Sequence, residues 1–199
     1  MAKVEFEKSQ TLINLARSFA GECQDGARYQ FIAQQAEQEG YNYLQTLLKT
    51  LAKNEMAHAK AFYDLITQNC KDKKHNINIE GGYPFECGNL QENLHDSIQT
   101  EVSQSNNVYP SFAQVARDEG FEEIAHQFDL VATVENCHHL LLTQILEKMK
   151  NKQLYKSVDA RKWKCSKCGF EHTSKQAWDS CPSCKMPQGY VEIPIDTGE

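Results

Sequence analysis

Residues 36–58 read AEQEGYNYLQTLLKTLAKNEMAH, and residues 116–138 read ARDEGFEEIAHQFDLVATVENCH. The two stretches share one pattern, position by position, from their first alanine to their last histidine. Small residues are followed by Glu-Gly-aromatic, and a Glu-x-x-His motif begins fifteen residues after the glycine. An internal repeat of this kind indicates two copies of one structural unit. Here the unit is a helical hairpin, and the two copies are expected to be related by a pseudo-two-fold axis.

Four stretches carry apolar residues at the spacing of an amphipathic helix. They are residues 10–39, 42–67, 90–119 and 122–150. Residues 68–89 contain KDKKHN, three glycines and a proline, and this composition predicts a long crossover with little helix. Some four-helix bundles need such a crossover to connect two parallel helices. The sequence therefore predicts a mainly α fold with a four-helix bundle over residues 1–150, whose third helix is distorted near Pro110.

The two Glu-x-x-His motifs are Glu55 with His58 and Glu135 with His138. Residues i and i+3 project from the same face of a helix, so each motif can present a carboxylate and an imidazole to one metal ion. A single motif of this kind is common by chance. Two motifs at equivalent positions of a repeat indicate a metal site.

The repeat also supplies one further glutamate upstream of each motif. Glu22 precedes Glu55 and Glu101 precedes Glu135 at nearly the same separation, which is one position longer in the second case. In antiparallel hairpins these separations bring each upstream glutamate level with its motif, as in di-iron carboxylate bundles. Four buried carboxylates would be very costly without partners, and two divalent ions would neutralise them. Mixed oxygen and nitrogen ligands suit iron or manganese, with zinc also possible.

Composition excludes several classes of function. The chain has 199 residues and a net charge of -6, which argues against a general nucleic-acid-binding protein. Its apolar runs are shorter than the about 20 residues of a membrane span, so no membrane partner is expected. The first ten residues, MAKVEFEKSQ, are charged and lack an apolar signal core, so export is not expected.

The last fifth of the chain holds two CxxC pairs, Cys165 with Cys168 and Cys181 with Cys184. Four thiolates in two such pairs can bind one tetrahedral metal ion. We expect residues 161–199 to form a small metal-stabilised module, joined to the bundle by a linker over residues 151–160. The spacing of the cysteines does not distinguish zinc from iron. Zinc would make the module a structural ribbon, whereas a single iron would make it a one-electron carrier.

Several motifs together resemble the rubrerythrin family along nearly the whole chain. They are FAGE (19–22), AEQEGY (36–41), NEMAH (54–58), YPSFAQVARDEGF (109–121), VENCHH (134–139), WKCSKCGF (163–170) and CPSCKMPQGY (181–190). The resemblance implies a ferritin-like di-iron domain followed by a rubredoxin-like domain with one iron bound by four cysteines. It also implies reduction of hydrogen peroxide to water in the cytoplasm, as protection against oxidative stress.

The resemblance assigns roles to particular residues. The implied di-iron ligands are Glu22, Glu55, His58, Glu101, Glu135 and His138. Tyr29 and Tyr109 match tyrosines near the ligand carboxylates. The implied ligands of the single iron are Cys165, Cys168, Cys181 and Cys184, although a recombinant preparation could carry zinc there.

Gln104 departs from the family pattern. Rubrerythrins usually have a glutamate three residues after the third-helix ligand, and in the family that carboxylate exchanges with a histidine at the position of His58. An amide stabilises ferric iron less than a carboxylate does. We hypothesise that the ligand exchange is altered and that the di-iron site is harder to oxidise, unless Gln104 coordinates through its amide oxygen.

The leading functional hypothesis is a di-iron peroxidase that receives electrons from the four-cysteine iron. The expected partners are hydrogen peroxide and an external NAD(P)H-dependent reductase or a rubredoxin, because the chain has no glycine-rich dinucleotide motif. The resemblance also implies a head-to-tail homodimer. One alternative is a ferroxidase or iron-storage protein, and another is a zinc-ribbon interaction module on a metal-binding bundle.

Overall fold

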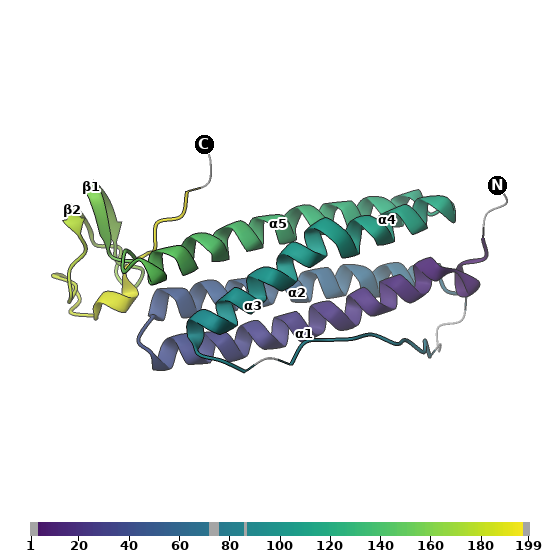
Figure 1. Ribbon diagram of the computed structural model, residues 1–199, viewed down its shortest axis with the longest axis horizontal. Helices are drawn as coiled ribbons and strands as arrows, with labels where there is room; N and C mark the ends of the chain where they lie inside the picture. Colours follow the sequence, from purple (N-terminus) through teal and green to yellow (C-terminus); the bar gives the residue numbers. More distant parts are fainter. Residues whose placement is uncertain (1–3, 72–75, 86, 197–199) are drawn as a thin grey trace.

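The computed structural model describes residues 4–71, 76–85 and 87–196. Long helices lie side by side and a small β module sits at one end of them (Figure 1). This is the predicted mainly α bundle, with a ferritin-like arrangement of the helices. The ends of the predicted ranges 1–150 and 161–199, and residues 72–75 and 86 of the predicted crossover, lie outside the described residues.

The first hairpin consists of α1 (Gln10–Gln38) and α2 (Asn42–Asn69). The second repeat forms the equivalent hairpin from α4 (Tyr109–Asp118) and α5 (Glu122–Lys150). Gly40 and Gly120 stand at the two turns with φ of 85° and 84°, a conformation that glycine adopts without strain. The matched backbone geometry of the two turns is the structural basis of the sequence repeat.

The third predicted helix is interrupted. It begins as α3 (Leu90–Ser103), continues as a π-helical turn (Gln104–Val108) and resumes as α4. The backbone N–H of Tyr109 donates to the carbonyl of Gln104, five residues earlier. A π turn accommodates one more residue than an α turn, and it lies just before the predicted distortion at Pro110. The added residue explains why Glu101 precedes its motif by one position more than Glu22 does.

The crossover between α2 and α3 runs along α1 for most of the length of the bundle (Figure 1). Its described residues contain no helix or strand. Hydrogen bonds attach its described residues to α1: Arg17 Nε donates to the carbonyl of Glu80 at 2.8 Å, Tyr83 donates to the carbonyl of Arg17 at 3.2 Å, and Gln35 Nε2 donates to the carbonyl of Gly88 at 3.5 Å. The predicted long crossover between the second and third helices is therefore confirmed.

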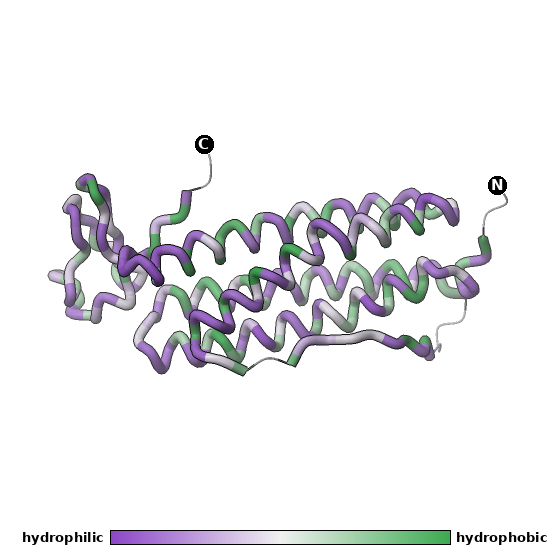
Figure 2. The backbone as a smooth tube through the Cα atoms, viewed as in Figure 1, coloured by the Kyte–Doolittle hydropathy of each residue, from purple (hydrophilic) through white to green (hydrophobic). Residues whose placement is uncertain are grey.

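Two apolar clusters fill the bundle, and hydrophobic residues alternate with hydrophilic ones along its helices (Figure 2). One cluster includes Leu48, Leu94 and Ile145, and the other includes Phe62 and Phe128. The glutamates of the two repeats are buried between these clusters along the helices. No helix within the described ranges is long and apolar enough to cross a membrane.

The C-terminal module contains a two-stranded antiparallel sheet, β1 (Lys156–Lys164) and β2 (Glu171–Gln176), and a short helix, η3 (Gln188–Tyr190). It packs against the end of the bundle through Leu154 and Ile193, which join the adjacent core cluster. Gln144 of α5 exchanges two hydrogen bonds with the backbone of Asp196, at 2.9 and 2.7 Å. The boundaries of the linker over 151–160 remain a prediction.

Glu119 at the end of α4 caps the first turn of α1. Its carboxylate accepts hydrogen bonds from the backbone N–H of Gln10 at 2.9 Å and of Thr11 at 2.8 Å, and from the Thr11 hydroxyl at 2.6 Å. Burial opposes ionisation, but these hydrogen bonds outweigh it and lower the pKa of Glu119. The carboxylate therefore stabilises the fold above its ordinary pKa of 4.5 and loses this effect as the pH falls through the lowered value.

We expect Glu119→Gln to lower the free energy of unfolding by about 1–2 kcal/mol at pH 7, as the loss of a helix cap does. Urea denaturation across pH should show this difference shrinking as the pH falls below 4.5 and through the lowered pKa of Glu119, where the parent carboxylate becomes protonated. Glu39 occupies the equivalent position of the first repeat and is exposed, so Glu39→Gln is the matched control. Equal losses in both variants would contradict the capping role.

Candidate metal centres

The structure gathers four glutamates and two histidines in the middle of the bundle. The residues are Glu22 of α1, Glu55 and His58 of α2, Glu101 of α3, and Glu135 and His138 of α5. They form two overlapping groups, and within each group one ligand atom from every residue lies within 4.8 Å of the others. Glu55 and Glu135 belong to both groups. This arrangement could hold two metal ions.

Distances to the two imidazoles show how the shared glutamates are placed. Nδ1 of His58 lies 3.1 Å from Glu55 Oε2 and 2.9 Å from Glu135 Oε1. Nδ1 of His138 lies 3.0 Å from Glu55 Oε1 and 2.9 Å from Glu135 Oε2. Each shared carboxylate thus directs one oxygen toward each histidine, which is the geometry of a ligand bridging two ions.

The two remaining glutamates each belong to one half of the cluster. Glu22 Oε2 lies 3.6 Å from Nδ1 of His58, and Glu101 Oε2 lies 3.8 Å from Nδ1 of His138. Several of these buried atoms have no well-formed hydrogen bond within the described residues: Glu22 Oε2, Glu55 Oε1, Glu101 Oε2, both carboxylate oxygens of Glu135 and His138 Nδ1. Buried polar atoms are normally satisfied. Their convergence therefore fits two bound cations.

In the metal-free form, protonation of some of these side chains reduces the net negative charge of the cluster. Burial raises the pKa of Glu22 well above its ordinary value and that of Glu101 to about 8. Burial also opposes the charged forms of Glu135, His138 and His58, but the close contacts of the Glu135 carboxylate with the two imidazoles outweigh it. The pKa of Glu135 falls to about 2, and the pKa of His58 and of His138 rises to about 12. Metal ions must displace protons to bind here.

Two tyrosines connect the hairpins across the cluster. The Tyr29 hydroxyl of α1 donates to Glu101 Oε1 of α3, and the Tyr109 hydroxyl of α4 donates to Glu22 Oε1 of α1. Both tyrosines are almost fully buried. Each hydrogen bond fixes the oxygen of a glutamate that is not shared between the two groups, so the predicted proximity of Tyr29 and Tyr109 to these carboxylates is present in the structure.

Sequence reasoning missed two polar residues beside the cluster. The side-chain amide of Asn54 lies 3.3 Å from Nε2 of His138, where it can orient the ring through the nitrogen that faces away from the glutamates. Asp25 is buried and pairs with Arg28, and burial raises its pKa. Asn54 directly precedes Glu55, and Asp25 follows Glu22 at i+3. These positions relative to Glu55 and Glu22 were the signals in the sequence that could have identified the two residues.

Gln104 lies in the π turn and is engaged with Asp25. Its Nε2 donates to Asp25 Oδ2 at 2.7 Å. The Gln104→Glu variant would replace this hydrogen bond with two facing carboxylates, so we expect its metal-free form to lose about 1–3 kcal/mol in free energy of unfolding. Chemical denaturation checks this, and adding Asp25→Asn should restore most of the loss. A fully stable single variant would contradict it.

The altered-ligand hypothesis for Gln104 has a separate test. Redox titration of the iron-loaded parent and of Gln104→Glu should give a higher potential for the parent, because an amide stabilises ferric iron less than a carboxylate does. Equal potentials would refute the hypothesis.

The four predicted cysteines of the C-terminal module lie together. Sγ of Cys165 is 3.8 Å from Sγ of Cys184, and Sγ of Cys168 is 3.7 Å from Sγ of Cys181. Four ligands about 2.3 Å from one tetrahedral ion are about 3.8 Å apart, whereas disulfide sulfurs are about 2.05 Å apart. The sulfurs are therefore spaced for a metal ion.

The two CxxC turns have the same backbone geometry. Gly169 donates its N–H to the carbonyl of Cys165 at 2.8 Å, and Lys185 donates to Cys181 at 2.9 Å. The φ angles of Gly169 and Lys185 are 76° and 63°. Gly169 adopts this φ without strain, and Lys185 adopts it despite its side chain. The backbone N–H of Phe170 lowers the pKa of Cys168 to about 7, which favours a thiolate ligand.

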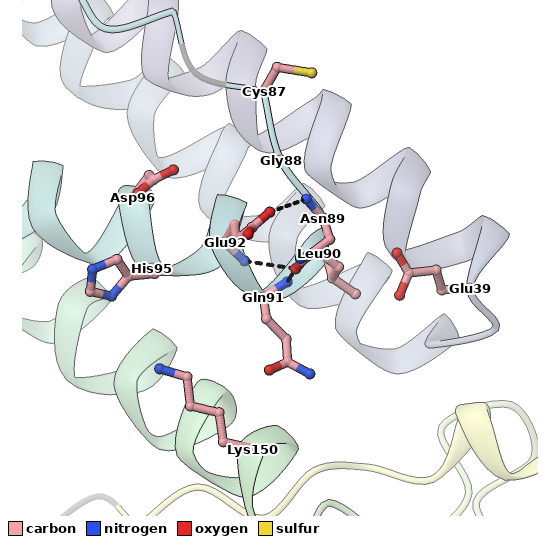
Figure 3. Close-up of a pocket in the computed structure, with 10 residues that line it drawn as sticks. All are labelled: Glu39, Cys87, Gly88, Asn89, Leu90, Gln91, Glu92, His95, Asp96 and Lys150. Carbon is pink, nitrogen blue, oxygen red and sulfur yellow. Dashed lines mark hydrogen bonds between the residues drawn. The ribbon is translucent and has the colours of Figure 1, made fainter.

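A pocket of about 870 Å³ at the start of α3 is a weaker candidate for a metal site. Glu92 and Asn89 are occupied by reciprocal capping hydrogen bonds, and the Cys87 thiol points away from them (Figure 3). His95 and Lys150 project from different helices without converging on one point (Figure 3). The bundle cluster and the four cysteines therefore remain the candidate centres.

Related proteins carry the same two-part organisation. A sequence model described as Rubrerythrin matches residues 14–86 and 92–168, and one described as Rubrerythrin, rubredoxin-like domain matches residues 163–192. Rubrerythrin-1 of Clostridium acetobutylicum is 35% identical over 93% of this chain and 94% of its own length. The rubrerythrin of Nitratidesulfovibrio vulgaris is 30% identical over 93% of this chain and 94% of its own length.

Solved structures share the fold at lower identity. Nigerythrin in a partially reduced state has a TM-score of 0.61 and 22% identity, over 96% of this chain and 93% of nigerythrin. Desulfovibrio desulfuricans bacterioferritin has a TM-score of 0.60 and 18% identity, over 72% of this chain and 82% of its own. The carboxylate–histidine cluster corresponds to a di-iron site and the four cysteines to a rubredoxin-like iron site. The chain belongs to the rubrerythrin family.

Proposed function

We propose that this protein reduces hydrogen peroxide to water at the bundle cluster, with electrons delivered by the four-cysteine iron. One observation carries the proposal: a single chain holds both a two-metal carboxylate cluster and a four-thiolate site. With two ions bound, the first would supply two adjacent redox-active Lewis acids, and the second, with one iron bound, would suit one-electron transfer. Reduction of each peroxide consumes two electrons and two protons and forms two water molecules.

The bound irons would supply the electrons and the affinity for peroxide oxygen, while the protein holds the ligands. Glu55 and Glu135 would be ligands in both halves of the cluster, whereas His58 and His138 would each be a ligand in one half. Tyr29 and Tyr109 keep the outer oxygens of Glu101 and Glu22 oriented through their hydroxyl protons. The buried position of the glutamates limits the access of bulk water.

Stopped-flow absorbance tests this activity. The iron-loaded protein is reduced without oxygen and mixed with stoichiometric peroxide, and the ferric-thiolate band of the four-cysteine iron is followed. Rapid return of the band supports a coupled peroxidase. A band that stays bleached, with iron assayed in both sites, contradicts it and favours the ferroxidase or storage alternative. A module that takes up zinc but no iron when the protein is loaded with iron without oxygen also contradicts it.

The two centres within one chain are far apart. Glu135 and the end of α5 at Lys150 are separated by about 22 Å of helix, at 1.5 Å per residue. The module lies beyond this end of the bundle (Figure 1), held there by Ile193 and Gln144. This separation supports a head-to-tail homodimer, in which the module of one chain reduces the cluster of the other.

Complementation between two inactive variants tests the dimer. Glu135→Gln disables the bundle cluster, and Cys165→Ser disables the four-cysteine site. When the two chains are unfolded and refolded together, mixed dimers should recover peroxide turnover, because the intact module of one chain can serve the intact cluster of the other. Each variant refolded alone is the control. No recovery in mixed dimers isolated with distinct tags would contradict transfer between chains.

The external electron source is a second element of the proposal. We infer an NAD(P)H-dependent reductase or a rubredoxin acting in the cytoplasm, since the chain lacks a dinucleotide-binding motif. Steady-state oxidation of NAD(P)H, with a reductase added and peroxide as acceptor, measures this directly.

A further inference from the structure

A pocket of about 610 Å³ lies between α1, the crossover and the π turn. We call it the crossover pocket. Its lining includes Ser18 and Asp25 of α1, Tyr83 of the crossover, Gln104 and Val108 of the π turn, and Phe112 of α4. The volume falls within the about 300–1,000 Å³ typical of small-molecule sites. Hydrogen peroxide, which is scarcely larger than water, would fill only a small part of it.

The inner end of this pocket adjoins the bundle cluster. Tyr109 also lines the pocket, and its hydroxyl donates to Glu22. Asp25 follows Glu22 by one helical turn, and Gln104 stands in the same relation to Glu101. One layer of side chains therefore separates the pocket from the candidate metal ligands.

Ser18 provides an unused polar group at this inner end. Its residue is 4% exposed, and its Oγ has no hydrogen-bond partner among the residues that the structure describes. A buried hydroxyl without a partner is costly, so a ligand that hydrogen-bonds to Ser18 Oγ would be favoured. The neighbouring Asp25 and Gln104 bond to each other, which leaves Ser18 as the free anchor.

The outer part of the pocket is largely apolar. Tyr83, Val108 and Phe112 line it, and the crossover segment that forms one wall is attached to α1 through Arg17. Asp25, Glu80 and Asp96 are also among the lining residues, with Arg17 as the cation. Because the acidic lining residues outnumber the single cation, the charge of the lining disfavours an anionic ligand. A neutral molecule with a small apolar group and a polar, hydrogen-bonding end fits both parts.

We propose that the crossover pocket binds organic hydroperoxides, R–OOH with a small neutral apolar R group, beside the metal centre. The peroxide end bonds to Ser18 Oγ, and R packs against Val108 and Phe112. The inference rests on the proposed peroxidase function and extends its substrate class. The O–O bond breaks as ROOH takes up two electrons and two protons, giving ROH and water. The electrons come from the reduced iron centres, which the external donor protein replenishes.

Kinetics of the iron-loaded protein test the proposal with cumene hydroperoxide and hydrogen peroxide in parallel. Ser103 is exposed and lies at the edge of the pocket, so Ser103→Trp should obstruct it. We expect the ratio of the cumene hydroperoxide rate to the hydrogen peroxide rate to fall about tenfold or more. Thr46→Trp, on the exposed surface of α2, is the control and should keep the parental ratio. Ser18→Ala should lower the ratio about threefold to tenfold.

A crystallographic readout is independent of turnover. Crystals of the iron-loaded protein soaked with 2-phenyl-2-propanol, the alcohol product, should show it between Ser18 and Phe112. An empty pocket would overturn the proposal, as would a Ser103→Trp ratio equal to the parent's. If hydrogen peroxide is reduced and cumene hydroperoxide is not, this proposal fails and the proposed function stands. If neither is reduced, both fail.

Discussion

The Glu135→Gln variant is expected to lose both bundle irons and about 3–5 kcal/mol of unfolding free energy in its metal-free form. The carboxylate of Glu135 lies between His58 and His138, at 2.9 Å from Nδ1 of each. Its pKa is lowered to about 2, whereas the pKa of each histidine is raised to about 12. At neutral pH the substitution removes the negative charge that lies between the two imidazolium groups.

Glu22→Gln is the matched control for this prediction. Burial raises the pKa of Glu22 well above its ordinary value, which favours the protonated form in the metal-free protein. Glutamine closely replaces a protonated glutamate in shape and charge. We therefore expect less than about 1 kcal/mol of change in stability, although iron binding in that half of the cluster should still be weakened.

Metal analysis and urea denaturation of the metal-free proteins check both variants. The iron bound by Cys165, Cys168, Cys181 and Cys184 should remain in each. A lowered pKa stabilises the fold above the ordinary value of 4.5 and ceases to do so as the pH falls toward about 2. The parent should therefore exceed Glu135→Gln in stability from neutral pH down to about pH 4.5. Similar losses in the two variants would contradict this charge distribution.

The repeat made most of the bundle predictable from sequence. Matching glycines at 40 and 120 placed the two turns, and the Glu-x-x-His spacing placed four candidate ligands on inward faces. The one-residue difference upstream of Glu101 was visible in the sequence, but its cause was not. A proline in the sequence predicts a distorted helix. A π turn, by contrast, is defined by which carbonyl accepts a hydrogen bond from each backbone N–H in the folded helix, and the sequence does not show this.

The neighbourhood of Gln104 was harder to predict for a related reason. Asp25 and Gln104 are 79 residues apart in the chain, and nothing in either segment indicates that they meet. Asp25 had the i+3 spacing from Glu22 that identified the histidines, yet an isolated acidic residue at that spacing is usually solvated. Only the packing of α1 against the π turn shows that its carboxylate is buried and hydrogen-bonded.

The pocket beside Ser18 could not be predicted from sequence either, because the crossover carries no periodic pattern. Composition predicted that residues 68–89 would contain little helix, but it did not predict their path along α1. Tyr83 and Arg17 fix that path through hydrogen bonds between segments about 66 residues apart. The cavity is thus a property of tertiary structure, unlike the metal ligands, whose spacing is local.

The Cys165→Ser variant is expected to abolish steady-state peroxide turnover while leaving the bundle cluster loaded with iron. Cys165 is fully buried, and its sulfur is 3.8 Å from that of Cys184. Metal binding at cysteine-containing sites of small modules contributes about 10–16 kcal/mol in zinc-finger peptides, so loss of one buried thiolate should remove the ferric-thiolate absorbance and unfold much of the module.

A single-turnover experiment separates electron supply from peroxide chemistry in this variant. A chemically reduced bundle should still consume about one equivalent of peroxide per cluster, because two ferrous ions hold the two electrons that this reaction needs. Turnover supported by the external donor should then stop, since no four-cysteine iron remains to pass electrons on. Ser166→Ala, which changes the residue beside Cys165 without removing a thiolate, is the control. Undiminished turnover in Cys165→Ser would mean that the donor reduces the cluster directly and that the module has another role.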